Sequence, residues 1–283
     1  MPAEYWPPGG LAGIGDEAAP DLAGQLRAIG ALGWPGVELR TVDGRALADL
    51  DRSARDQLVL AVARAGLRVP CLDSRIGSWS GSVAEPFDRD LAELATLAEL
   101  CADLDTSYVR IMSYPNAGLP ERDWRATVLD RVRRLTEVAE RAGITLLHEN
   151  CAGWAGTSAE RAIELLDAVG SPALRLLFDV GNGIAHGYDA AGLLADLVPF
   201  VAHVHVKDAV GGGEDTAYTL PGDGQAGVVD CLKRLRANGY AGALSIEPHL
   251  ATRPHEGRWA DAGGAAAFVA AGRRLAELVR GTE

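Results

Sequence analysis

The sequence predicts an α/β protein, a closed (β/α)8 barrel that forms a single domain over residues 1–283. Short runs rich in Val, Ile and Leu alternate with amphipathic segments along the chain, a pattern typical of parallel strands joined by crossover helices. Eight such runs occur in 283 residues, which suits one barrel. An open doubly wound sheet is the competing fold, but no G-x-G-x-x-G turn follows the first candidate strand.

Each expected strand is a short apolar run, and the first, LAGIGD, is the weakest candidate. The strands are expected at residues 11–16, 36–40, 67–74, 107–113, 144–150, 174–180, 204–208 and 243–249. The helical segments carry apolar residues at i, i+3 and i+4, the spacing of one helix face. They are expected at residues 20–33, 53–66, 87–104, 123–143, 158–170, 228–239 and 266–281. Several end at a glycine, as helix C-termini prefer.

The composition excludes several kinds of partner. The balance of 39 acidic and 27 basic residues gives a net charge of −12, which works against binding to nucleic acid or anionic membranes. No run approaches the ~20 apolar residues of a membrane span, and MPAEYWPPGG lacks a signal-peptide pattern. The four cysteines form no C-x-x-C pair, so we expect core thiols of a cytoplasmic protein rather than disulfides or a thiolate zinc site.

Alternate residues of a barrel strand face the helices and the barrel axis in turn. One parity of the expected strands is apolar and should face the helices, with Val37, Leu39, Val109, Ile111, Leu176, Phe178, Val204, Val206, Leu244 and Ile246. The other parity should point inward and carries Glu38, Arg40, Arg110, Glu149, Asp179, His203, His205, Lys207, Ser245, Glu247 and His249. Most of these polar residues end their strands, at the mouth where barrel active sites are built.

Four of these inward residues form a candidate metal site. Glu149, Asp179, His205 and Glu247 place three carboxylates and one imidazole at the ends of four consecutive strands. Their mutual repulsion would be severe without a cation among them. Oxygen-rich ligation with one nitrogen suits one divalent ion such as Mn²⁺, Mg²⁺ or Co²⁺, with Zn²⁺ as a further alternative.

Five motifs of the chain resemble those of one superfamily. HEN at 148–150, FDVGN at 178–182, HVHVKD at 203–208, PGDGQAGVVD at 221–230 and SIEPH at 245–249 are similar to motifs of the xylose isomerase-like TIM-barrel proteins. The resemblance covers nearly the whole chain. It implies a TIM barrel, a small carbohydrate or polyol substrate and one divalent metal ion, with Mn²⁺ as the first choice. Because members of this superfamily often form dimers or tetramers, a homo-oligomer stays open.

By this resemblance Glu149, Asp179, His205 and Glu247 are the metal ligands, and Glu149 and Glu247 are also the catalytic acid/base pair. The implied function is a metal-dependent sugar isomerase or epimerase that transfers a proton through a metal-bound enediolate. The runner-up is a dehydratase, a lyase of a keto-cyclitol or hydroxy-ketone, as in inosose dehydratase. A sugar-binding barrel without catalysis is a third hypothesis, which the pair of glutamates counts against.

The motifs depart from the ketose 3-epimerases at two places. Asn182 stands where those enzymes usually carry a histidine, and Lys207-Asp208 stands where they carry a glutamate and an arginine. H-x-H-x-K-D is closer to the inosose dehydratase branch, which leaves epimerisation or dehydration open. Asn182 is predicted to contact substrate, and so, less strongly, is His186 in the same glycine-broken segment.

The other inward residues allow two interpretations each. Lys207 is expected either to bind a substrate oxygen or to form a salt bridge with a barrel carboxylate. Arg110 and Glu38 are expected either to contact substrate or to pair with each other. His203 lies two residues deeper than His205 and should support it rather than bind the metal.

Three further residues lie outside the inward face. Trp79 and Trp154 fall in loops after strands, where an aromatic ring could pack on a sugar or simply close the loop. His148 has the helix-facing parity and is expected to be a core residue.

Overall fold

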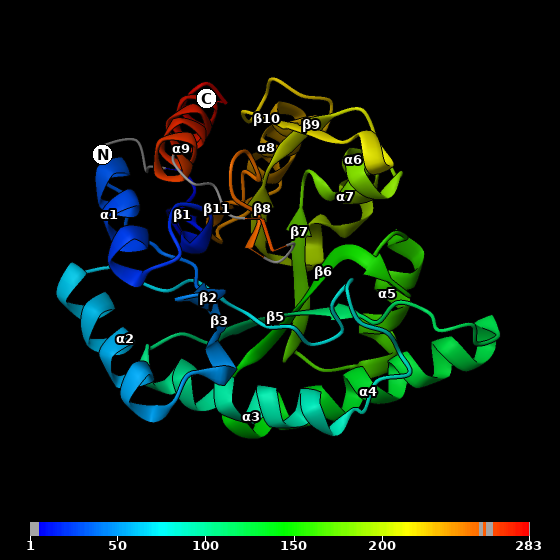
Figure 1. Ribbon diagram of the computed structural model, residues 1–283. Helices are drawn as coiled ribbons and strands as arrows, with labels where there is room; N and C mark the ends of the chain where they lie inside the picture. Colours follow the sequence, from blue (N-terminus) through cyan, green and yellow to red (C-terminus); the bar gives the residue numbers. More distant parts are fainter. Residues whose placement is uncertain (1–5, 255–256, 259–262, 283) are drawn as a thin grey trace.

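The computed structural model describes residues 6–254, 257–258 and 263–282, and within them the chain forms a parallel β-barrel ringed by helices (Figure 1). The main sheet has seven strands in the order β1-β11-β8-β7-β6-β5-β4. Their bounds are β1 Leu11–Gly13, β4 Leu72–Asp73, β5 Tyr108–Ser113, β6 Thr145–Gly153, β7 Leu174–Asp179, β8 Val201–Val206 and β11 Leu244–Ile246. The sequence-based prediction of a TIM barrel is confirmed.

The segment 36–39 closes the barrel between β1 and β4. It pairs in parallel with both neighbours through the bridges Ile14 to Glu38 and Leu39 to Leu72. Backbone bonds continue the ladder, since Glu38 N–H donates to Gly13 at 2.9 Å. This segment is the second strand that the sequence predicts, although its pairing is too short to count as a regular strand. The closure matters because it brings the Glu38 side chain inside the barrel.

Helices follow the strands around the outside. The long helices are α1 Leu22–Leu32, α2 Arg52–Ala65, α3 Asp88–Asp103, α4 Glu121–Ala142, α5 Ala159–Val169, α8 Val228–Ala237 and α9 Gly264–Arg280. Short 3-10 turns lie at Gly15–Glu17, Leu47–Asp49, Val198–Phe200 and Gly213–Asp215. Aspartate or serine side chains cap the first turns of α1, α2 and α5. Left-handed glycines end the same three helices, as their sequence predicts.

Some elements were not expected from the sequence. Helix α7, Ala190–Leu197, connects β7 to β8 after the short helix α6, Asn182–His186. With eight residues, α7 is too short to show a clear helical period, and Gly187 separates it from α6. Two small hairpins decorate the barrel mouth, β2 Thr41–Val42 with β3 Arg45–Ala46, and β9 Asp208–Val210 with β10 Ala217–Thr219.

The apolar parity of the strands packs against the helices as expected. Val109, Phe178 and Val204 are among the residues of one large buried core between barrel and helices. A second, small cluster of Cys71, Leu147 and Leu177 fills the inside of the barrel. The polar inward residues are buried as well, and a buried charge needs a partner.

The cysteines and His148 lie in the core, as their apolar sequence surroundings predict. All four cysteines are free and buried. His148 is 1% exposed, and burial lowers its pKa to about 4, so the imidazole is neutral at pH 7. Among the described helices, none is long and apolar enough to cross a membrane.

Asp208 anchors the loop 221–227 that follows the β9–β10 hairpin. The buried carboxylate accepts four backbone N–H bonds, from Ala209 at 2.9 Å, Gly222 at 2.8 Å, Gly224 at 3.0 Å and Ala226 at 3.0 Å. A Cβ at Gly224 would lie 2.2 Å from Asp208 Oδ1, so this close approach requires glycine. The PGDGQAG motif is thus a tight turn around a carboxylate, not a phosphate cradle.

We therefore expect Asp208→Ala to destabilise the protein by about 3 kcal/mol or more, because it leaves buried N–H groups without acceptors. Urea unfolding measures this loss. Asp223→Ala in the same loop is the control, since the Asp223 side chain is half exposed and bonds only Arg274, at 3.2 Å, among the described residues. Equal unfolding midpoints for the two variants would contradict the anchoring role.

Candidate active site

A cavity of about 610 Å³ opens at the C-terminal ends of the barrel strands. Its lining includes both buried charged residues and exposed rim residues. The buried charged ones are Arg40, Asp73, Arg110, Glu149, Lys207, Glu247 and His249, and the buried amide of Asn182 lies among them. Residues nearer the rim include Arg45, Arg75, Trp79, His186 and Tyr218. The structure thus brings most of the predicted site residues to one hollow, at the mouth where barrel enzymes place their chemistry.

The four predicted metal ligands meet at the base of this mouth. Glu149 lies in β6, Asp179 ends β7, His205 lies in β8, and Glu247 directly follows β11. Asp179 and His205 are register partners, so the two side chains leave their strands at the same height. One potential ligand atom from each of the four lies within 4.8 Å of all the others.

His205 points an unused nitrogen at the carboxylates. Its Nε2 bonds Glu38 Oε1 at 2.8 Å, whereas Nδ1 makes no hydrogen bond to any described residue. Nδ1 lies 3.8 Å from Glu247 Oε2 and 4.0 Å from Asp179 Oδ2. Burial opposes the charged imidazolium, but the carboxylates of Glu38, Asp73 and Glu247 together outweigh burial and raise the pKa of His205 to about 10.

Lys207 supplies the positive charge between two of the acids. Its Nζ lies 2.8 Å from Asp179 Oδ2 and also contacts Glu247 Oε2. Burial disfavours the ammonium, but Asp179 and Glu247 outweigh it and raise the pKa of Lys207 well above its usual value. The salt-bridge interpretation of Lys207 is therefore what the structure shows, with the side chain still lining the cavity.

The two acids beside Lys207 are not equivalent. Burial and the nearby carboxylates raise the pKa of Asp179, which has Lys207 as its main opposing charge. Glu247 is also buried, but Lys207, His249 and Arg40 together hold its pKa well below the usual range. The remaining Asp179 oxygen, Oδ1, accepts the backbone N–H groups of Gly181 and Asn182 at 2.8 and 2.7 Å.

Glu149 is held from two sides. Asn182 Nδ2 donates to Oε1 at 2.9 Å, and Arg110 Nη1 donates to Oε2 at 3.1 Å. Arg110 Nη2 also donates to the carbonyl of Ser74 at 2.8 Å, which fixes the guanidinium. The predicted pairing of Arg110 with Glu38 is therefore wrong, because Arg110 pairs with Glu149 and lies 3.6 Å from Asp73.

Glu247 is anchored by a network that the sequence analysis did not foresee. Arg40 Nη1 donates to Glu247 Oε1 at 2.5 Å, and the same guanidinium bonds Asp16 and Glu17. Glu17 in turn holds His249, whose Nδ1 lies 2.6 Å from Glu17 Oε1. A signal for this network is present in the sequence, because two acids lie at the end of the first expected strand, in LAGIGDE.

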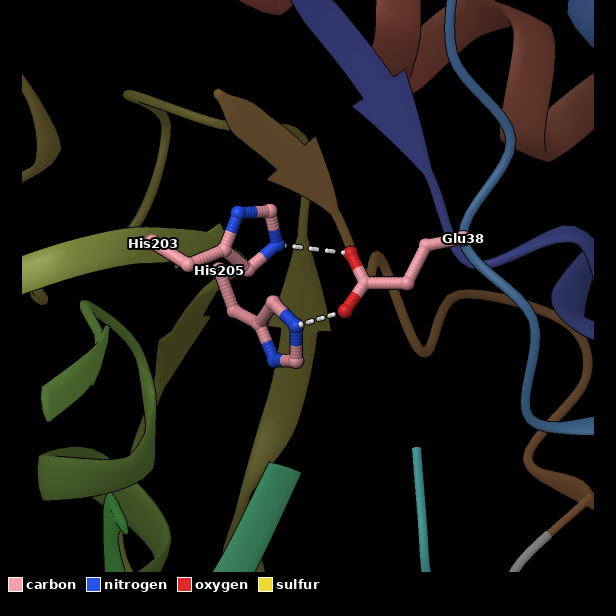
Figure 2. A group of neighbouring side chains, drawn as sticks. All are labelled: Glu38, His203 and His205. Carbon is pink, nitrogen blue, oxygen red and sulfur yellow. Dashed lines mark hydrogen bonds and ion pairs between the residues drawn. The ribbon is translucent and has the colours of Figure 1, made fainter. Parts of the chain in front are cut away.

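Glu38 lies away from the cavity, which corrects the expectation that it reaches the substrate site. Its carboxylate is fully buried and does not line the cavity. Both oxygens instead bond histidines at 2.8 Å, Oε2 with His203 Nε2 and Oε1 with His205 Nε2 (Figure 2). The supporting position predicted for His203 agrees with this geometry. Burial opposes the Glu38 charge, yet the two histidines hold its pKa well below the usual range.

The aromatic predictions had mixed outcomes. Trp154 is 1% exposed, does not line the cavity, and donates its indole N–H to Glu121 at 2.9 Å, so its predicted sugar contact is corrected. Trp79 lines the cavity and is 37% exposed, so it stays a candidate sugar contact. His186 also lines the cavity, with its Nε2 3.3 Å from Cys151 Sγ.

Asp73 is the lining residue that sequence reasoning missed. It ends β4 and is 4% exposed, and neither of its carboxyl oxygens has a hydrogen bond to a described residue. Burial raises its pKa well above the usual value despite nearby Arg110. An aspartate at the C-terminal end of a barrel strand, on the inward parity, was the available signal.

The four ligand residues fit a divalent metal ion. His205 offers a buried nitrogen that has no hydrogen bond among the described residues, and three carboxylates converge on the same point. Hard carboxylate oxygens with one imidazole are a donor set that Mn²⁺ and Mg²⁺ accept. The second ring nitrogen of His205, Nε2, bonds the Glu38 carboxylate. A metal-binding histidine usually has such a carboxylate partner on its other nitrogen.

Lys207→Met should destabilise the metal-free protein by about 3–5 kcal/mol, because it leaves the buried acids Asp179 and Glu247 without their shared cation. Urea unfolding in the presence of a chelator measures the loss. Lys233→Met on the exposed face of α8 is the control and should cost little. If the Lys207 variant unfolded at the wild-type midpoint, the ion pairs would not stabilise the site.

Comparisons with known proteins identify the family to which the chain belongs. The family profile described as "Xylose isomerase-like TIM barrel" matches residues 26–266. A 2-epi-5-epi-valiolone 7-phosphate 2-epimerase from Actinoplanes sp. is 30% identical over 230 residues, 78% of this chain and 79% of that protein. An inosose dehydratase from Clostridium perfringens is 29% identical over 144 residues, 46% of this chain and 48% of that protein.

The solved structures agree on the fold. A xylose isomerase-like TIM barrel protein from Mycobacterium smegmatis, in complex with magnesium, superposes with a TM-score of 0.71 at 17% identity, covering 100% of this chain and 99% of that chain. At this identity the likeness concerns the fold alone. The matching profile and the named relatives together confirm the predicted family and the prediction that the chain is an enzyme. The chain belongs to the xylose isomerase-like TIM-barrel family of sugar isomerases and epimerases.

Proposed function

We propose that the enzyme epimerises or isomerises a small keto-sugar or keto-polyol and depends on one divalent metal ion. The observation that carries this proposal is the convergence of Glu149, Asp179, His205 and Glu247 within 4.8 Å, beside a cavity of about 610 Å³. A cavity of this volume suits a small ligand. The epimerase relative supports the same reaction class, since it matches over most of both chains.

The four residues would hold the ion, with Mn²⁺ as the proposed metal and Mg²⁺, Co²⁺ or Zn²⁺ as alternatives. When bound, such an ion polarises a substrate carbonyl and so acidifies the neighbouring C–H group. All other steps fall to side chains of this chain. Asn182, Lys207 and Arg110 line the cavity beside the ligands, where their donors could orient substrate oxygens.

Glu149 and Glu247 are the proposed proton carriers. They come from β6 and from the end of β11, and β7 and β8 lie between these two strands in the sheet. They therefore reach the cavity from different sides of the site. One carboxylate would remove the proton next to the carbonyl, and the other would return a proton to the opposite face, which inverts that carbon. The low pKa of Glu247 keeps its carboxylate ionised at neutral pH, the form in which a general base acts.

Dehydration is the alternative outcome at the same site. It begins with the same proton removal, but a neighbouring hydroxyl then leaves as water and needs a proton donor. Asp73 is a specific observation in favour of this alternative, since burial raises its pKa and it lines the cavity. The inosose dehydratase relative is a second one, although its match covers less than half of either chain.

Proton exchange with solvent is the test of the proposed chemistry. Metal-loaded enzyme is incubated in D₂O with ketopentoses, ketohexoses and inososes, with and without a phosphate group. We expect deuterium next to the carbonyl, with an inverted centre if the product is an epimer. An unsaturated product would assign the dehydratase instead. No exchange with any of these substrates, after metal loading has been verified, would count against the proposal.

Glu149→Gln and Glu247→Gln should each slow this exchange by about 100-fold or more, because glutamine cannot carry the proton. Glu160→Gln, on the exposed face of α5, is the matched control and should exchange at the wild-type rate. Mass spectrometry or NMR of the recovered sugar measures the exchange. An unchanged rate in either active-site variant would remove that glutamate from the proposed mechanism.

Metal affinity should rise with pH. Below its pKa of about 10, His205 carries a proton on Nδ1 that a metal ion must displace. One displaced proton changes the affinity by about tenfold per pH unit. Mn²⁺ affinity measured by electron paramagnetic resonance should therefore weaken as the pH falls from about 8.5 to about 6.5. A Kd that stays constant over this range would show that no such proton is displaced.

A further inference from the structure

The fully buried Glu38 bridges two histidines of one strand. Its two carboxyl oxygens lie 2.8 Å from His203 Nε2 and 2.8 Å from His205 Nε2, and the two imidazole rings stand nearly perpendicular, at 85°. Glu38 belongs to the segment 36–39, which pairs with the chain just after β1. In the order of the barrel strands, β1 and β11 separate this segment from β8, which carries both histidines. Figure 2 shows the carboxylate reaching across the barrel interior to both rings.

This arrangement fixes which nitrogen of His205 is free. An imidazole has two nitrogens, and the one that bonds a carboxylate carries a proton. Glu38 therefore holds a proton on Nε2 of His205, and the ring must turn Nδ1 toward Asp179 and Glu247. Nδ1 has no hydrogen-bond partner among the described residues, as expected of an atom kept for another ligand.

His203 in turn limits the freedom of Glu38. Rotation of the carboxylate would break the bond from Oε2 to His203 as well as the bond from Oε1 to His205. All three side chains are at most 1% exposed, so water cannot replace a lost partner. The trio is also close enough to suggest a metal site of its own, but its facing atoms already satisfy one another at hydrogen-bond distance.

We propose that Glu38 is a positioning residue that selects Nδ1 of His205 as the metal-binding atom, and that His203 locks Glu38 in place. This inference rests on the proposed metal-dependent function, because it assigns a purpose to the unbonded nitrogen. It gives His203 and Glu38 a functional task although neither touches the cavity.

Glu38→Gln is the sharpest test. The amide has the shape of the carboxylate but replaces one acceptor oxygen by an NH₂ donor, which conflicts with an Nε2–H group. One histidine must then change tautomer, and the negative charge behind His205 is lost. We expect the Kd for Mn²⁺ to rise by about 10- to 100-fold, the usual effect of removing the partner of a metal-binding histidine.

Cys71→Ala is the matched control. Cys71 Sγ lies within 4.8 Å of the Glu38 carboxylate, is equally buried, and bonds only the carbonyl of Leu72, at 3.6 Å, among the described residues. This variant disturbs the packing beside Glu38 without removing a bond to it, so Mn²⁺ affinity should stay at the wild-type value. Urea unfolding of each variant separates lost stability from lost metal affinity.

A measurement on the wild-type protein covers the case in which Glu38→Gln does not fold. Protein labelled with ¹⁵N-histidine and loaded with Zn²⁺ is examined by long-range ¹H–¹⁵N NMR, with His205→Gln used to assign the signals. We expect His205 to carry its proton on Nε2 and to bind the metal through Nδ1. A proton on Nδ1, with the metal on Nε2, would overturn the inference.

The outcomes of the binding test are distinct. Weaker Mn²⁺ binding by folded Glu38→Gln, with Cys71→Ala unchanged, supports the positioning role. Equal affinity of Glu38→Gln and wild type overturns it and leaves the proposed function intact, even if the variant is less stable. Wild-type protein that binds no divalent ion overturns the proposed function, and this inference falls with it.

Discussion

The neutralisation of buried negative charge at the barrel mouth is the constraint on which the rest of the structure depends. The buried acids there include Asp16, Glu17, Glu38, Asp73, Glu149, Asp179 and Glu247. An uncompensated charge in such an interior costs several kcal/mol, so each acid needs a cation or a set of donors within reach. The strand parity provides them, because Arg40, Arg110, His203, His205 and Lys207 share the inward face.

Polar atoms at the barrel mouth differ in whether protein partners already bind them, and this difference distinguishes supporting groups from groups that can act on a ligand. Both oxygens of Glu38 are bonded to histidines, and the side chain does not line the cavity, so this carboxylate supports the site rather than reaching a ligand there. The atoms without a hydrogen bond among the described residues include His205 Nδ1 and both Asp73 oxygens. His205 Nδ1 faces the metal-ligand cluster, and Asp73 lines the cavity. Unsatisfied polar atoms are costly, and their position beside a cavity indicates ligand chemistry rather than poor packing.

The sequence was sufficient for the fold and for the four-residue cluster, because both follow from periodicity. Period-two alternation identified the inward face, and the position of Asp179 or Glu247 at a strand end identified the mouth. Periodicity does not show how deep an inward side chain lies in the barrel or which residue it contacts. Glu38 and Arg110 share an inward parity, but closure of the barrel pairs Glu38 with β8 and Arg110 with β6. Trp154 lies in a loop, and whether a loop residue folds inward depends on tertiary packing.

The surroundings of the two proposed proton carriers differ in a way that suits opposite roles. Glu247 contacts Arg40 and Lys207 directly, and His249 adds to the positive field that lowers its pKa. Glu149 contacts one cation, Arg110, and the neutral amide of Asn182. Two carboxylates in unequal surroundings are suited to the two different roles of an acid/base pair. Arg40 is itself fixed by Asp16 and Glu17, which lie after β1, so the first strand of the barrel contributes to the charge balance around Glu247 at the last strand.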